Sequence, residues 1–520
     1  MASGPRPLTG WAWGAALVAA LLALLTLGTA VVVGLGAGRR LWPAPADWAA
    51  VRFTLGQAAL SAGLSCLLAV PVARALARRR FVGRAALISV MGAPFLLPVI
   101  VAILGLLAVF GRAGIVNDIG GALGLPVLRI YGLHGVVLAH VFLNLPLAVR
   151  MLLMGWQAIP AERFRLAQSL NLTPGAQFRH LEAPMLRAVL PGAAVAIFVI
   201  CLTSFAVALT LGGGPGATTV ELAIYQALRF DFDPARAAGL ALVQFTLCAL
   251  AAGFGWAALR EAGFGAGLGR AAVVPAPGGW RRGMDALAIA LAAGFLLVPL
   301  GAVLARGLAG LDDLPPGLWP AAGRSVAVAV VSTAATLAMA LPLALAVARR
   351  ARGTGLFEAA AMLPLAASGL VLGTGLFLVL RPWVAPAQMA LPVTVLVNAV
   401  LALPFVYRLL LPEARALQAD HDRLARALGL RGMARLRWVT LPVLARPLGF
   451  GAGVAAALSM GDLGVITLFA GDGGATLPMV VHRLMGAYLM QAAAGAAVIL
   501  VAISFALFAL FDGVGRRVAA

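Results

Sequence analysis

Residues 423–444 read RLARALGLRGMARLRWVTLPVL, and residues 165–186 read RLAQSLNLTPGAQFRHLEAPML. The two stretches share arginine, leucine, alanine and proline at the same spacing, and they begin 258 residues apart in a chain of 520. Arginine clusters that start at Ala77 and Ala348 extend the similarity, at a spacing of 271 residues. The chain therefore contains an internal repeat, and a basic segment lies at the same place in each half.

The surroundings of these segments are strongly apolar. Hydrophobic residues make up 62% of the chain, charged residues only 11%, and the mean hydropathy is +1.01. A soluble protein carries about 25% charged residues. The net charge of +21 comes from short arginine clusters between apolar runs, with no basic face and interleaved aromatics, which argues against a nucleic-acid partner. We expect an all-α, polytopic protein whose partner is the lipid bilayer, because the apolar runs are continuous rather than alternating.

A helix needs about 20 apolar residues to cross roughly 30 Å of hydrocarbon. Twelve runs meet this length: 11–35, 53–76, 86–111, 131–153, 188–211, 236–258, 284–307, 323–347, 357–380, 389–411, 447–469 and 487–511. Tracing the chain through them places 28 of the 39 arginines on one side and 11 on the other. Arginine excess marks the cytoplasm, so we expect both termini and both basic segments to be cytoplasmic.

The repeat predicts two pseudo-repeated halves of six helices. The first half is 1–262, with spans 1–6 and the basic segment 159–187. A Gly/Pro-rich cytoplasmic linker, 263–283, leads to the second half, 284–520, with spans 7–12 and the basic segment 415–446. Halves in the same orientation are related by an axis along the membrane normal, and a substrate path usually lies between them.

The sequence contains no lysine, since all 39 basic residues are arginine. A phosphate-binding loop G-x-x-x-x-G-K-[ST] is therefore excluded, as is Schiff-base chemistry. The three cysteines lie in apolar runs and the five histidines are scattered, so we predict neither a metal site nor a cofactor in this chain. No grouping of nucleophile, base and orienting residue suggests an enzyme.

Aligned on its proline, each basic segment resembles the EAA motif of bacterial ABC-importer permeases: E-A-A, three residues, G, nine residues, I-x-L-P. In that family the segment forms a coupling helix that fits a groove of the ATPase. The resemblance implies these ATPase-coupling residues: Arg165, Leu166, Ala167, Asn171 and Pro184 in the first copy, and Arg423, Leu424, Ala425, Gly429 and Pro442 in the second. Gly175 is a further candidate in the first copy, because a glycine there permits a sharp turn and close backbone approach. Arginine replaces the leading glutamate in both copies, and Asn171 replaces the glycine in the first.

Polar side chains within spans are costly in lipid and often line a path. The candidates for a translocation path are His140, Asn144, Ser204, Asn398 and Asp462. For Asp462 two roles stay open, a hydrogen bond inside the bundle or a carboxylate that faces the path. Between the fifth and sixth spans, a glycine-rich outer turn precedes a short amphipathic helix over 218–228. Its candidate residues are Gly212, Gly213, Gly214, Thr218 and Glu221.

The runs 131–153, 210–238 and 459–469 resemble the permeases of thiamine/thiamine-pyrophosphate ABC importers, and the similarity extends through most of the chain. This resemblance implies a type I (MetI-like) importer permease in a bacterial inner membrane. It would import thiamine and its phosphates, with an ATPase dimer that binds ATP and Mg²⁺ in the cytoplasm and a periplasmic thiamine-binding protein at the outer turn. A path-facing Asp462 would then favour cationic thiamine. Ferric-iron permeases of the same architecture, and a twelve-span secondary transporter, remain alternatives.

Overall fold

The structure is a computed structural model that describes residues 10–38, 44–92, 97–259, 278–349, 353–469, 471 and 474–519. In the first half the helices are α1 (Gly10–Ala23), η1 (Leu24–Gly28), α2 (Thr29–Ala37), α3 (Pro45–Arg78), α4 (Arg84–Val90), α5 (Val99–Phe110), α6 (Ile115–Ala122), α7 (Leu133–Ala158), α8 (Ala161–Ser169), α9 (Pro174–Gln177), η4 (Phe178–Glu182), α10 (Ala183–Leu202), α11 (Phe205–Leu211), η5 (Pro215–Ala217), α12 (Val220–Arg229) and α13 (Pro234–Leu259). The predicted linker lies outside the described residues over 263–277.

The second half continues with α14 (Trp280–Ala309), α15 (Leu318–Ala348), α16 (Thr354–Met362), η6 (Leu363–Ala366), α17 (Gly369–Leu380), α18 (Pro386–Ala427), α19 (Gly432–Arg435), η7 (Leu436–Thr440), α20 (Leu441–Met460), α21 (Gly464–Phe469), α22 (Leu477–Gly486) and α23 (Met490–Ala519). The described residues contain no strand. Within the described part of the chain, eleven helices are long and apolar enough to cross a membrane, and one bent pair brings the number to twelve. The all-α, multi-span prediction is confirmed.

The predicted third and ninth spans are not single straight helices. Thr354–Ala366 and Gly369–Leu380 meet at 93°, and the Ser368 hydroxyl accepts a hydrogen bond from the Val371 N–H (3.1 Å) to begin α17. In the first half, α4 ends at Val90 and α5 begins only at Val99, directly after Pro98. The predicted spans 86–111 and 357–380 each correspond to more than one helix, because hydropathy measures apolar length and does not register a bend.

The fifth and eleventh spans also differ from the prediction. Each breaks near its C-terminal end, between α10 and α11 and between α20 and α21. Each also begins earlier than expected, with a five-residue π-helical turn (η4, η7) directly before the helix that contains Pro184 or Pro442. Proline has no N–H for the i→i−4 hydrogen bond of a regular α-helix. The wider π turn before each proline accommodates this missing bond and lets the helix continue.

The chain packs as two compact units, which we describe separately. Unit 1 comprises residues within 1–47, 223–249 and 307–520, and unit 2 comprises 48–222 and 250–306. These groupings differ from the predicted sequence halves. In unit 1, α1 and α2 from the first span pack on α15, α16 and α17 of the second half. In unit 2, α14 of the seventh span packs on the first half, where Phe142 and Phe295 have ring centroids 5.6 Å apart.

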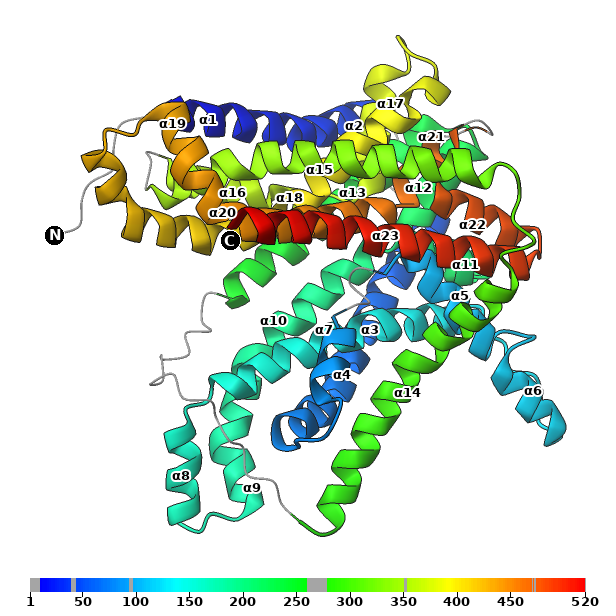
Figure 1. The fold of residues 1–520 in the computed structure, drawn as a ribbon. Coiled ribbons are helices and arrows are strands. Elements are labelled where there is room, and N and C mark those ends of the chain that lie inside the picture. The colour runs from blue at the N-terminus through cyan, green and yellow to red at the C-terminus, as the bar shows by residue number, and fades with distance from the viewer. Residues whose placement is uncertain are drawn as a thin grey trace. The chain divides into compact units, whose positions relative to one another are not determined.

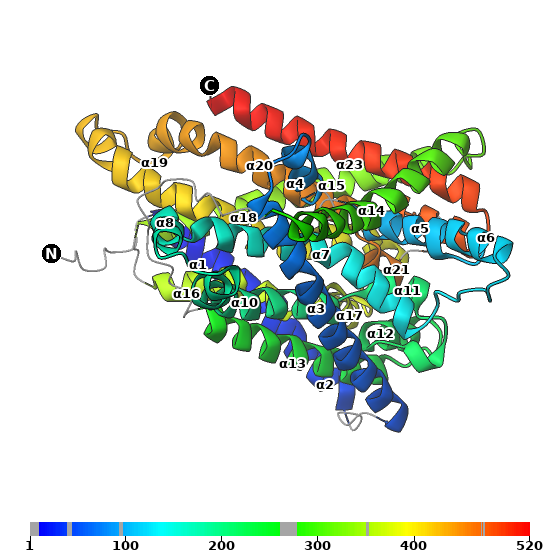
Figure 2. The same cartoon turned by 90° about the horizontal axis from the view of Figure 1, so that it is seen from below.

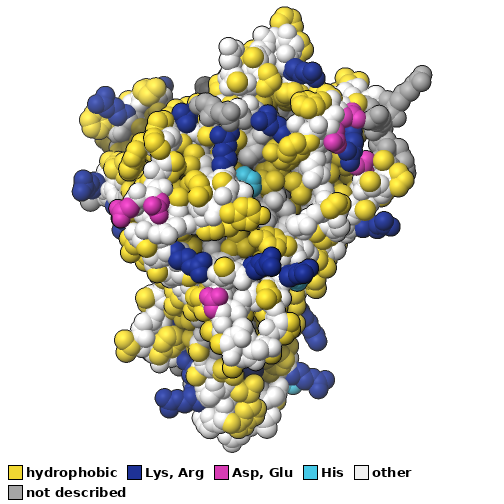
Figure 3. All heavy atoms as spheres, turned by 90° about the vertical axis from the view of Figure 1, so that its right-hand side faces the viewer, with side chains coloured by type: hydrophobic (Ala, Val, Ile, Leu, Met, Phe, Trp, Pro, Cys, Tyr) yellow, Lys and Arg dark blue, Asp and Glu magenta, His cyan; other side chains and the backbone are white. Residues whose placement is uncertain are grey.

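The core of unit 1 is a bundle of α15, α18, α20 and α23. Figures 1 and 2 both show α20 and α23 side by side, and their glycines explain the close approach. A Cβ added at Gly449 would lie 2.6 Å from the Gly515 Cα, so only glycine fits at this crossing. Small residues at helix crossings are how membrane helices reach van der Waals contact. Figure 3 shows one face of the molecule, on which hydrophobic side chains are widespread and arginines are scattered.

Candidate functional site

The first coupling segment (159–187) begins as the short helix α8, separated from α7 by Ile159 and Pro160. Arg165 is exposed and Ala167 is buried. Leu166 is 60% exposed, and Leu170, one turn later, is 62% exposed. Two large apolar side chains therefore stand side by side on the surface next to an arginine.

The second coupling segment (415–446) repeats this arrangement at the end of α18. Leu424 and Leu428 are 59% and 64% exposed, Arg423 is exposed, and Ala425 is buried. Residues four apart on a helix share one face, so each segment presents a leucine pair. Exposed paired leucines in two copies, at the same positions of the repeat, are typical of a surface that a partner covers.

Both helices end in the same way, on a residue with left-handed backbone. Asn171 has φ 49° and Gly429 has φ 68°. The Leu172 N–H donates to the Ala167 carbonyl, and the Leu430 N–H donates to the Ala425 carbonyl, both at 2.9 Å. This is a Schellman cap. Asparagine is the non-glycine residue that best tolerates the left-handed region, so Asn171 replaces the motif glycine without changing the geometry.

The prediction that Gly175 also supports a sharp turn was wrong. Gly175 lies inside α9 and does not have a positive φ, and a Cβ added there would meet nothing within 4 Å. Its counterpart in the repeat, Met433, carries a full side chain. Pro184 and Pro442 lie at the start of α10 and α20, after the π turns described above.

Ion pairs that the sequence reasoning missed hold the two segments in place. In the first, the buried Glu182 carboxylate pairs with Arg74 (2.5 Å) and Arg78 (2.7 Å) of α3. In the second, Asp422 pairs with Arg426 (2.9 Å) and Arg435 (2.8 Å). The two copies use different positions for their carboxylates, so alignment of the repeat could not find them. Each segment contains two acidic residues among its arginines, and the sequence does not show which of the two is paired.

Three of the predicted path residues are buried in hydrogen-bonded clusters. His140, Asn144 and Asn398 are 2%, 3% and 6% exposed. In unit 2 the Asn144 amide donates to the His140 carbonyl (2.8 Å). In unit 1 the Asn398 amide donates to the Ser459 hydroxyl (3.0 Å). These contacts favour a role inside the helix bundles for all three.

The remaining pair, Ser204 and Asp462, occupies equivalent places in the repeat. Both are half-buried and lie at the helix breaks, Ser204 before α11 and Asp462 before α21. One carboxylate oxygen of Asp462 accepts a hydrogen bond from the Gly464 N–H (3.1 Å). Unwound backbone within a span is a common position for transport sites, because its polar groups can face a substrate.

The predicted outer turn is only partly accessible. Gly213 and Gly214 are exposed, with φ of 71° and 139°, and a Cβ at Gly213 would lie 2.8 Å from the Tyr131 Cβ. Thr218 is half-buried, whereas Gly212 is buried and Glu221 is only 1% exposed. The expected short helix is present as α12. In this structure the glycines can contact a partner and the Glu221 side chain cannot.

Together, the apolar spans and the two exposed leucine pairs are typical of a membrane permease that works with separate subunits. Residues 337–520 match the family of binding-protein-dependent transport system inner membrane components. The chain is 40% identical to the thiamine transport system permease protein ThiP of Brucella abortus (strain 2308), over 95% of this chain and 94% of that protein. The namesake proteins of Salmonella typhimurium (strain LT2) and Escherichia coli (strain K12) are 38% and 39% identical, over 99% and 94% of this chain and 99% and 95% of their own length. The chain belongs to the family of thiamine transport system permeases.

Proposed function

We propose that this chain forms the translocation path for thiamine and thiamine phosphates in an ABC importer of a bacterial inner membrane. The observation that carries the proposal is similarity to thiamine permeases along nearly the whole chain, both halves included. It supports thiamine over the ferric-iron alternative, which rested on shared architecture alone.

ATP hydrolysis belongs to a partner in this proposal, because a chain without lysine has no phosphate-binding loop. An ATPase dimer would receive one coupling segment in each subunit, through the leucine pairs Leu166/Leu170 and Leu424/Leu428. Closure of the dimer on ATP and Mg²⁺ would displace both segments, and this displacement would favour one of two packings of the spans. Both coupling segments and both termini then face the cytoplasm, as the arginine distribution predicts.

Arg165 and Arg423 stand where the family motif has glutamate. Both are exposed beside the leucine pairs, so we propose that they meet carboxylates on the ATPase. An Arg423→Glu variant should lose ATPase association, and a compensating acidic-to-basic change on the ATPase should restore it. If Arg423→Glu leaves association and transport intact, the acidic partner is excluded.

On the opposite side, a periplasmic thiamine-binding protein would deliver substrate near the exposed Gly213 and Gly214. Asp462 is our candidate for contact with the substrate cation, because it is half-buried at a helix break. An Asp462→Asn variant should reduce thiamine flux, and Asp313→Asn, at an exposed carboxylate between α14 and α15, is its matched control. Normal flux in a folded Asp462→Asn variant would leave Asp462 with its hydrogen bond inside the bundle alone.

The decisive experiment is uptake by the full chain, reconstituted in vesicles with its ATPase and binding protein. Labelled thiamine should enter only when the binding protein is outside and ATP is inside the vesicle. Uptake that persists without ATP but with a proton gradient would favour a secondary transporter. Uptake of ferric iron in place of thiamine would overturn the proposed substrate.

A further inference from the structure

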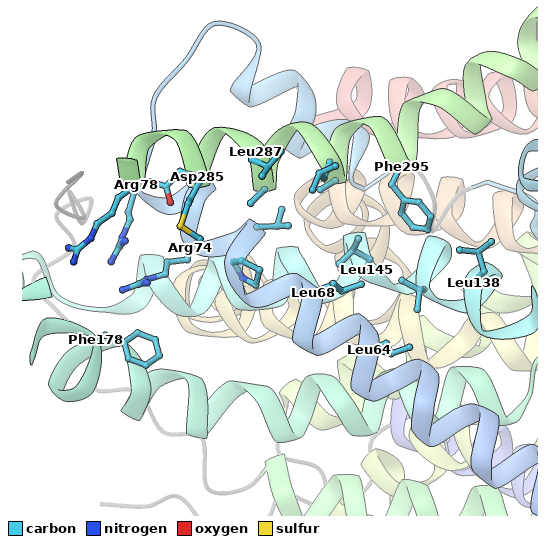
Figure 4. A pocket seen from close by; sticks show the side chains of 18 of the residues that line it. Leu64, Leu68, Arg74, Arg78, Leu138, Leu145, Phe178, Asp285, Leu287 and Phe295 are labelled. Atoms are coloured by element: carbon cyan, nitrogen blue, oxygen red, sulfur yellow. The ribbon is translucent and has the colours of Figure 1, made fainter. Parts of the chain in front are cut away.

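Unit 2 contains a groove of about 1300 Å³ between α3, α7 and α14. Figure 4 shows its walls, where Leu64 and Leu68 of α3, Leu138 and Leu145 of α7, and Leu287 and Phe295 of α14 point toward one another. None of the predicted path residues lines it. The groove is therefore separate from the candidate transport site.

The equivalent place in unit 1 is closed. Pro342 of α15 is the repeat counterpart of Pro71 of α3, which lines the groove. At Pro342, α1 lies close: a Cβ added at Gly14 would be 3.9 Å from the proline Cβ, and the neighbouring Ala15 is fully buried. The seventh span instead carries large side chains here, and Leu291 remains 64% exposed. The groove thus follows from the sequence of α14 and is not common to both halves of the fold.

One end of the groove is basic. Arg74, Arg78 and Arg281 line it together with Asp285. Glu182 neutralises only one of its two arginine partners, and Asp285 pairs with Arg79 at 2.7 Å. Arg281 lies against the ring of Trp280, 5.7 Å from the centroid, and has no carboxylate within 4 Å among the described residues. Four arginines and two carboxylates leave a local excess of two positive charges.

The length of the apolar part suits one leaflet of a bilayer. From Arg74 to Leu64 is ten residues of helix, about 15 Å at 1.5 Å per residue, or half of a roughly 30 Å hydrocarbon core. At the basic end Trp280 is 71% exposed, and tryptophan is enriched at the headgroup level of membranes. Over an 18-residue apolar stretch of each helix, 28% of the residues of α14 are buried, against 72% in α7, so the groove borders a surface-exposed helix.

We infer that this groove binds an anionic phospholipid of the leaflet on the arginine side. Its phosphate contacts Arg281 and Arg74, and one acyl chain lies along the leucines of α3 and α7. Charge complementarity selects an anionic headgroup over a zwitterionic one, because the basic end carries an unbalanced positive charge. A small polar solute would fit less well, because the long leucine-lined part of the groove offers no hydrogen-bond partners for the polar groups of the solute.

The headgroup end also includes part of the first coupling segment. Gly175 and Phe178 line the groove, and the Arg74 guanidinium lies 4.9 Å from the Phe178 ring centroid. A lipid phosphate at Arg74 would therefore share this arginine with Glu182 of the same segment. The bound lipid contacts the connection between coupling helix and fifth span in this half alone.

The test is native mass spectrometry of the full-length chain with phosphatidylglycerol or phosphatidylethanolamine of identical acyl chains. We expect phosphatidylglycerol to be retained preferentially. An Arg281→Gln variant should bind it about fivefold more weakly, the effect of one arginine near an anionic membrane surface. Arg306→Gln, at the other end of the same helix and outside the groove, is the matched control and should bind as the parent does. Ala288→Trp, which fills the groove, should reduce retention of phosphatidylglycerol.

Thermal unfolding without added lipid checks that each variant is folded. Equal retention of the two lipids would overturn the inference, and so would unchanged binding in both Arg281→Gln and Ala288→Trp. Displacement of the lipid by thiamine diphosphate would assign the groove to the transported substrate and would also overturn it. None of these readouts depends on uptake, so failure here is distinguishable from failure of the proposed transport function.

Discussion

Shortening the exposed leucine pair of the second coupling segment, by Leu424→Ala with Leu428→Ala, should weaken ATPase association and leave the fold intact. Burying a whole leucine side chain is worth about 1.5–3 kcal/mol. The exposed fractions of 59% and 64% leave about three-fifths of that available to a partner. After allowing for the methyl group that alanine retains, the pair contributes about 2–3 kcal/mol, so the dissociation constant should rise roughly 30- to 150-fold.

The assay is equilibrium binding of the purified ATPase to the full chain in lipid nanodiscs, with thermal unfolding measured alongside. Leu304→Ala with Leu308→Ala is the matched control, because these leucines of α14 have the same spacing and are 52% and 57% exposed. Truncation of a surface side chain leaves no cavity, so the unfolding temperature should not change. Unchanged ATPase affinity, or an equal loss in the control, would refute the assignment of this surface.

Three further outcomes are expected. Asn171→Ala should destabilise the chain by about 1–2 kcal/mol through its left-handed φ, whereas Asn171→Gly should be close to neutral; thermal unfolding compares the two. Glu182→Gln should cost about 3–5 kcal/mol, because it leaves two arginines of α3 without their buried carboxylate, and a midpoint within 1 °C of the parent would contradict this. Burial lowers the pKa of His482 in α22, outside the candidate spans, so the folded state resists protonation. Stability should therefore fall as pH drops below about 6.5, the pKa of the unfolded histidine, and His482→Gln should flatten this dependence.

The sequence was sufficient for the class, the number of apolar segments and the repeat. The length of an apolar run and the positions of the arginines are read directly from the sequence, and they do not depend on how the helices pack. The repeat also makes Leu166 and Leu424 equivalent, whereas their exposure is known only from the structure. Composition could not predict the helix breaks at Ser204 and Asp462, since a broken span and a straight one have the same hydropathy.

The grouping into units was equally inaccessible from the repeat. Similarity between the halves shows which residues are equivalent, but it does not show which helices pack against each other. The first helix packs on the second half through small residues such as Ala15, and the seventh packs on the first half at Gly105, where a Cβ would lie 2.8 Å from the Pro299 carbonyl oxygen. Such contacts depend on complementary shape between residues far apart in the chain. The groove beside α14 is invisible in sequence for the same reason.

The two coupling surfaces are similar, but they are connected to their transmembrane spans in different ways. The second ends a continuous helix of 42 residues, about 63 Å long, that also contains the tenth span, whereas the first is jointed to the fourth span at Ile159 and Pro160. A displacement of the second surface is transmitted into the tenth span along a single helix. The same displacement of the first surface must pass through the non-helical connection between α7 and α8, which can bend and so transmit less of it. In the proposed assembly, a symmetric ATPase dimer would therefore displace the two halves of this permease unequally.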